Sequence, residues 1–83
     1  MHADDEGLVE AVGVAIKDHL RRHPLAADSA EGVARWWLGL AHANVTVAQV
    51  ERALNLLVAG REMRSLSLMD GTILYSQAPP TRQ

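Results

Sequence analysis

Apolar positions in the first two thirds of the chain recur at helical spacing, which predicts three helices. The first helix is expected over about residues 5–23, and Pro24 ends it because the residue before a proline is pushed out of the α region. Its apolar stripe consists of Val9, Val12, Ile16 and Leu20. One face of this helix should therefore lie in a core.

The second helix is expected to open at Asp28 or Ser29 and to run to about Ala41. Asp28 precedes Glu31 by three residues, which is the spacing of a capping box. At about 100° per residue one face collects Ala30, Val33, Ala34, Trp37 and Ala41. Trp37 is therefore the expected core tryptophan, whereas Trp36 points more than a quarter turn away.

The third helix begins at a second capping box, Thr46-Val47-Ala48-Gln49, and is expected to run to about Ala59. Gly60 is the expected C′ residue, because a glycine adopts the left-handed conformation that ends many helices. The core stripe should consist of Val47, Val50, Leu54, Leu57 and Val58.

After Gly60 the apolar period changes from helical to alternating, and Asp70-Gly71 separates two alternating segments. This dipeptide is a strong signal for a two-residue type I′ hairpin turn between strands at about residues 63–68 and 73–76. That register pairs Leu68 with Ile73 and Leu66 with Tyr75, and turns all four side chains toward the helices. Residues 77–83 are expected to form a flexible tail.

The predicted fold is a single α+β domain over residues 1–83, ordered from about 5 to 76: three helices followed by a two-stranded antiparallel β-hairpin. The run from Thr46 to Gly60, followed by Met69-Asp70-Gly71-Thr72 and Tyr75, resembles winged helix-turn-helix domains of bacterial transcription regulators. The resemblance implies that the third helix is a recognition helix in the major groove of double-stranded DNA. It also implies that the hairpin is the wing.

The resemblance makes one set of residues candidates for DNA binding. Gln and Asn side chains can pair with adenine edges and Arg with guanine, while further arginines can contact phosphates. The candidates are Thr46, Ala48, Gln49, Arg52, Asn55, Arg61 and Arg64. Any exposed helix face carries some polar residues, so an ordinary solvated surface explains them equally well.

The charge balance weakens the DNA interpretation. The formal net charge is −2, and residues 46–83 carry four arginines against three acidic residues. DNA-binding domains are usually basic, because phosphate contacts supply much of the affinity. Some domains that resemble winged helices bind proteins instead, and this is the alternative function.

Three apolar residues are candidates for a protein contact, with homodimerisation as the commonest form. Trp36 lies outside the core stripe of its helix, Val14 fits the first stripe poorly, and Leu56 is expected to point outward. The alternative is that both tryptophans are buried in a small core that contains no phenylalanine.

Enzyme, cofactor and metal functions are not expected. The chain has no cysteine, no glycine-rich phosphate loop and no recognisable catalytic motif. His19 and His23 have metal-ligand spacing on one helix face but no matched third ligand. No apolar run approaches the roughly 20 residues of a membrane span and the N-terminus is not a signal peptide, so no membrane partner and a cytoplasmic location are expected.

Overall fold

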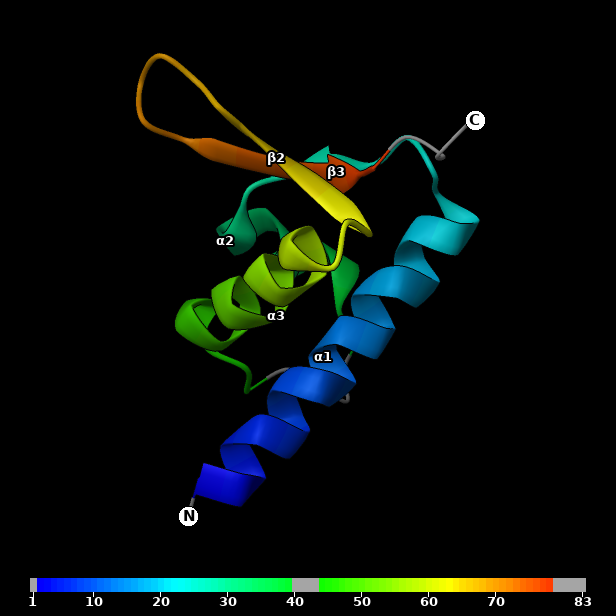
Figure 1. Cartoon of the computed structure of the whole chain (residues 1–83), viewed down its shortest axis with the longest axis vertical. Coiled ribbons are helices and arrows are strands. Elements are labelled where there is room, and N and C mark those ends of the chain that lie inside the picture. Colours follow the sequence, from blue (N-terminus) through cyan, green and yellow to red (C-terminus); the bar gives the residue numbers. More distant parts are fainter. Residues whose placement is uncertain (1, 40–43, 79–83) are drawn as a thin grey trace.

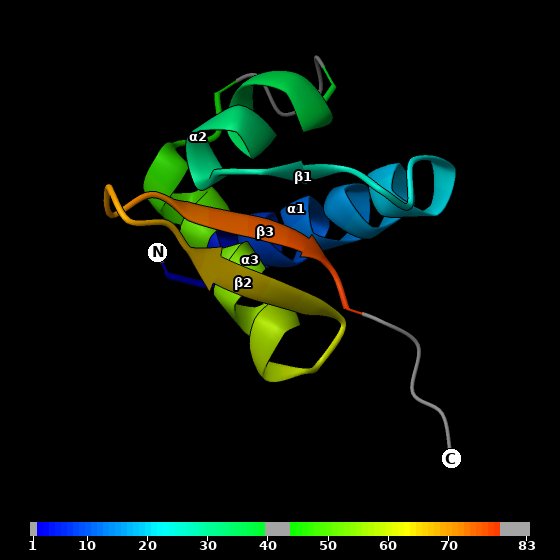
Figure 2. The ribbon, with the colours of Figure 1, turned by 90° about the horizontal axis from the view of Figure 1, so that it is seen from above.

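The computed structural model describes residues 2–39 and 44–78, which form an α+β fold (Figure 1). The helical elements are α1 (His2–Arg22), α2 (Ala30–Gly32), the π-helix η1 (Val33–Trp37) that continues α2, and α3 (Val47–Ala59). The strands are β1 (Ala27–Asp28), β2 (Met63–Ser67) and β3 (Ile73–Gln77). They form an antiparallel sheet in the order β1-β3-β2, which lies beside the helices (Figure 2).

The sheet has one strand more than the predicted hairpin. β1 pairs with β3, with Ala27 opposite Ser76 and Asp28 opposite Tyr75. A two-residue strand is too short to show the alternation by which a strand is recognised in a sequence. β3 also extends to Gln77, one residue into the predicted tail; residues 79–83 lie outside the described part of the chain.

The predicted hairpin register is wrong by one residue. Ser67 lies opposite Ile73 and Leu66 opposite Leu74, so the loop holds three residues, Met69-Asp70-Gly71. Gly71 has φ 92°, as in a type I turn followed by a left-handed residue. Because successive side chains alternate between faces, a slip of one residue exchanges the faces. Leu66 consequently points away from the helices and is 61% exposed.

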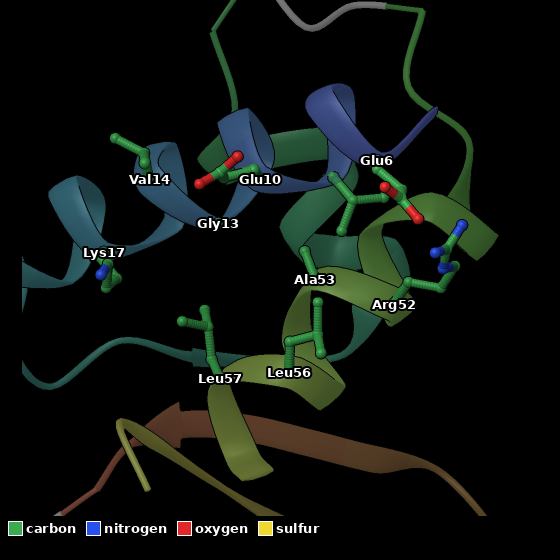
Figure 3. A pocket seen from close by; sticks show the side chains of 10 residues that line it. Glu6, Glu10, Gly13, Val14, Lys17, Arg52, Ala53, Leu56 and Leu57 are labelled. Carbon is green, nitrogen blue, oxygen red and sulfur yellow. The ribbon is translucent and has the colours of Figure 1, made fainter. Parts of the chain in front are cut away.

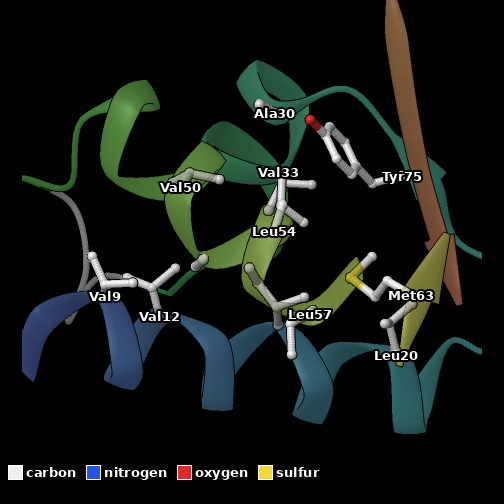
Figure 4. Packing of buried hydrophobic residues seen from close by; sticks show 12 residues of the cluster. Val9, Val12, Leu20, Ala30, Val33, Val50, Leu54, Leu57, Met63 and Tyr75 are labelled. Carbon is white, nitrogen blue, oxygen red and sulfur yellow. The ribbon is translucent and has the colours of Figure 1, made fainter. Parts of the chain in front are cut away.

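The core lies between α1, α3 and the sheet (Figure 4). All four members of the predicted α1 stripe are buried, and Tyr75 anchors β3 as expected. On α3 the prediction for Val47 is wrong, since this residue is 42% exposed and Ala53 is buried in its place. The core consists of Val9, Val12, Ile16, Leu20, Ala30, Val33, Val50, Ala53, Leu54, Leu57, Met63 and Tyr75.

The second helix is shorter than predicted. Ser29 is its N-cap, and the Ser29 Oγ accepts a hydrogen bond from the Gly32 N–H at 3.2 Å, so the expected Asp28–Glu31 box does not form the cap. The helix widens into η1 and ends at Leu38, whose backbone is extended (φ −94°, ψ 143°). The predicted end at Ala41 lies outside the described residues.

Both ends of α3 are defined by hydrogen bonds. Thr46 and Gln49 form the predicted capping box. At the C-terminus the left-handed residue is Arg61 (φ 65°) and not Gly60. The Arg61 N–H donates to Val58 O and the Glu62 N–H to Leu57 O, which is a Schellman arrangement with an arginine at C′.

The carboxylate of Asp28 leaves no room for a side chain at Gly32. The Asp28 Oδ1 accepts a hydrogen bond from the Ser29 N–H at 2.8 Å and lies where a side chain on Gly32 would stand. A Cβ at Gly32 would come within 1.9 Å of this oxygen. The Asp28 carboxylate at the end of β1 therefore occupies the space that a side chain at position 32 would need.

We expect Gly32→Ala to lower the free energy of unfolding by about 1 to 2 kcal/mol, because the Asp28 carboxylate must leave its site. In an Asp28→Ala background the same change should raise stability by about 0.5 to 1 kcal/mol through helix propensity. Gly7→Ala, where nothing lies within 4 Å of an added Cβ, is the matched control and should be stabilising. Chemical denaturation of the four variants measures this, and an equal effect of Gly32→Ala in both backgrounds would contradict it.

Candidate functional site

A groove of about 580 Å³ lies between α1 and α3 (Figure 3). Two of the three residues predicted for protein contact lie on it: Val14 of α1 is 60% exposed and Leu56 of α3 is 63% exposed. The lining residues are Glu6, Val9, Glu10, Gly13, Val14, Lys17, Arg52, Ala53, Leu56 and Leu57. Two helices that are far apart in the sequence thus present their outward apolar side chains to the same hollow.

The floor of the groove is apolar and its rims are charged. Val9, Ala53 and Leu57 are buried core residues that close the bottom. Above them α1 carries acidic side chains toward its N-terminus and Lys17 toward its C-terminus, while Arg52 stands on the α3 side. Protein interfaces also combine an apolar centre with a polar rim.

The acidic residues of this rim, Glu6 and Glu10, were not predicted as site residues from the sequence, and Lys17 was considered only as part of a basic stretch at the end of the helix. Glu6, Glu10 and Lys17 share the face of Val14 at spacings of four, eight and eleven residues from Glu6. This spacing is visible in the sequence. The residues lie on the polar side of the helix, however, where no core stripe is expected.

The two adjacent tryptophans lie in different environments. Trp36 is 72% exposed on η1 and is not one of the groove residues. Trp37 is half-buried and stacks on His19 of α1, with ring centroids 4.5 Å apart and planes inclined by 17°. Trp37 packs against the core as predicted, while the exposed Trp36 and the groove are separate features.

The residues predicted to read bases divide into two sets. Ala48, Arg52 and Asn55 are exposed along α3. Thr46 and Gln49 instead cap the helix: the Thr46 Oγ1 accepts from the Gln49 N–H at 3.1 Å, and the Gln49 Oε1 accepts from the Thr46 N–H at 3.0 Å. These two side-chain oxygen atoms therefore already form hydrogen bonds at the N-terminus of α3.

The arginines predicted for phosphate contact lie at the base of the hairpin. Arg61 follows α3, and Arg64 is the second residue of β2, where its Nε donates to Ser76 Oγ at 3.4 Å. The loop at the other end, Leu68 to Thr72, carries Asp70 and no cation. The hairpin tip is thus apolar and acidic, which disfavours phosphate contact there.

His19 contacts both His23 and Trp37, and the described residues offer no third metal ligand beside the two histidines. The rings of His19 and His23 are 4.7 Å apart, and no group of three His, Cys, Asp or Glu in the described residues could hold a metal ion. Partial burial lowers the pKa of His19 from 6.5; the positive charges of His23 and Arg22 lower it further, and Asp18 opposes them. The folded domain therefore favours a neutral imidazole.

Stability should fall as the solution is acidified below the ordinary pKa of His19. The unfolded chain takes up this proton at about pH 6.5, whereas the folded chain takes it up at lower pH. We expect the free energy of unfolding to decrease from about pH 7.5 to about pH 5.5, and His19→Phe, which keeps an aromatic ring beside Trp37, to reduce that slope.

Asp70→Asn is the matched control for this measurement. The Thr72 N–H donates to the Asp70 Oδ1 at 2.9 Å and lowers the pKa of this carboxyl below 3.8. Its contribution to stability is therefore lost only at more acidic pH, and the variant should keep the wild-type slope in the histidine range. An unchanged slope in His19→Phe would show that His19 is not its source.

No protein-family model, curated protein or solved structure matches this chain in comparison with known proteins. In the part of the chain that the structure describes, no helix has the length and apolar character needed to cross a membrane.

Proposed function

We propose that this chain is a winged-helix domain that serves as a protein-interaction module and binds another protein chain in the groove between α1 and α3. The observation that carries the proposal is the meeting of Val14 and Leu56, both exposed, over a buried apolar floor. Exposed apolar side chains that gather on one hollow with a polar rim often mark a protein contact site.

The order of the elements supports the winged-helix part of the proposal. A first helix, a short strand, a second helix, a third helix and a hairpin follow one another, and β3 lies between β1 and β2. The hairpin follows α3 directly and packs on it through Met63, which agrees with the layout of a recognition helix followed by a wing. A fold of this kind is used for more than one function, so the site must carry the argument.

The distribution of charge favours protein over DNA as the partner. Arg52 is the only cation of α3, Arg61 and Arg64 lie at the base of the hairpin, and Asp70 lies at its tip. A phosphate backbone requires several cations on one continuous face. The groove needs none, because its contacts are apolar at the floor and mixed in charge at the rim.

A photo-crosslinking amino acid placed at single positions of the full chain in cells tests the proposal. We expect one discrete adduct from positions 14 and 56, in the groove, because their side chains would lie against the partner. Ala11 and Asn55 are exposed on the same two helices and do not line the groove, so these control positions should give much less of it. Equal yields at all four positions would contradict the proposal.

DNA binding is the second candidate, favoured by Ala48, Arg52 and Asn55 along the exposed side of a well-capped α3. If it is correct, the chain binds a pool of duplexes at low salt, and Arg52→Ala reduces the salt dependence by about one charge. Arg35→Ala is the control. It removes a cation that lies outside α3 and pairs with Glu31, so it should leave binding unchanged. No binding of the wild-type chain at low salt would eliminate this candidate.

A further inference from the structure

We infer that the occupant of the groove is α1 of a second copy of this chain, packed antiparallel across a two-fold axis. The inference rests on the proposed function, because it requires the groove to be a protein-binding surface. It specifies the partner, the direction of the two helices and the residues that meet.

The charges on one face of α1 are self-complementary in this arrangement. That face carries acidic residues in its N-terminal half and basic residues in its C-terminal half, in the order Glu6, Glu10, Gly13, Val14, Lys17 and Arg21. A two-fold axis between Gly13 and Val14 places Glu10 opposite Lys17 of the second copy, because the two residues are equally far from the centre. The same axis places Glu6 opposite Arg21.

A two-fold interface repeats every contact, so each of these ion pairs occurs twice. Parallel helices, in contrast, would place acidic residues against acidic residues and basic against basic. The antiparallel direction also sets the positive end of one helix dipole beside the negative end of the other. Charge alone therefore selects one direction and one register.

The centre of the interface has room for close approach. Nothing lies within 4 Å of a Cβ added to Gly13, so this part of the face is open in the single chain. Val14 is beside it, and Leu56 of α3 lines the same groove. The second α1 would thus cover the apolar side chains that the single chain exposes, with the ion pairs at both ends.

The contacts that these cations make within one chain are weak. Lys17 Nζ lies 3.6 Å from Glu62 Oε1, and Arg21 pairs with Asp18 one turn before it. Both pairs are exposed, and exposed ion pairs contribute little to stability. Lys17 and Arg21 can therefore turn toward a second chain at small cost.

Charge reversal tests the geometry on the purified full chain. Wild type should be a reversible dimer in sedimentation equilibrium, whereas Glu10→Lys and Lys17→Glu each place like charges together twice and should weaken the dimer about tenfold or more. In an equimolar mixture of the two variants, a heterodimer again sets a lysine opposite a glutamate in both places. The mixture should therefore recover wild-type association.

The double variant Glu10→Lys/Lys17→Glu provides the matched control. It restores both ion pairs with reversed polarity and should dimerise alone, whereas a misfolded or generally weakened surface would not recover. Thermal unfolding of each single variant at a concentration where it is monomeric checks that the fold is kept, since Lys17→Glu also removes the contact with Glu62. High salt should weaken the wild-type dimer.

The outcomes separate this inference from the proposed function. A purified wild-type chain that stays monomeric up to near-millimolar concentration overturns the inference, while a discrete adduct from position 14 in cells still supports a different protein partner. A dimer whose affinity is the same in both single variants also overturns the inference, because the partner would then pack elsewhere. Absence of both dimer and adduct overturns both proposals.

Discussion

The apolar seam between α1 and α3 is the contact on which the rest of this small structure depends. Val12 and Ile16 of α1 and Val50 and Leu54 of α3 are fully buried. A domain of this size buries a modest share of its surface, so the loss of one such contact removes much of its stability. The sheet and α2 pack around this pair of helices, and the hairpin takes its position from buried side chains of β2 and β3.

The same seam produces the groove. Two helices that touch along buried stripes diverge on the solvent side, and the hollow between them forms where the side chains are small. Gly13 and Ala53 are such residues, one from each helix. The floor therefore belongs to the core, so a partner in the groove would extend the core that already holds the monomer together.

The helical part of the fold could be predicted because its signals are local. The spacing of the apolar stripe on α1 and the Thr46–Gln49 box each determine their own element. The strand register could not be predicted, because Asp70-Gly71 serves both a two-residue and a three-residue loop. β1 was not predicted, because its two residues are ordered by pairing with β3, a contact that only the folded chain makes.

The candidate site was predictable in part for the same reason. Val14 and Leu56 were identifiable one by one as apolar residues on polar faces, but their meeting depends on how α1 crosses α3. Arg61 and Arg64 are near each other in the sequence and near the predicted wing. Their position at its base already follows from the predicted strand at about residues 63–68 and the turn at Asp70-Gly71.

The face on which each hairpin side chain lies depends on whether the loop at Gly71 holds an odd or an even number of residues. Because side chains alternate along a strand, an odd change in loop length exchanges the inner and outer faces of one strand, whereas an even change preserves them. With the three-residue loop Leu66 lies opposite Leu74 on the outer face, whereas a two-residue loop would turn Leu66 to the inner face. In the evolution of such a hairpin, insertion or loss of one loop residue would move Leu66 between the outer and the inner face without any substitution in the strands.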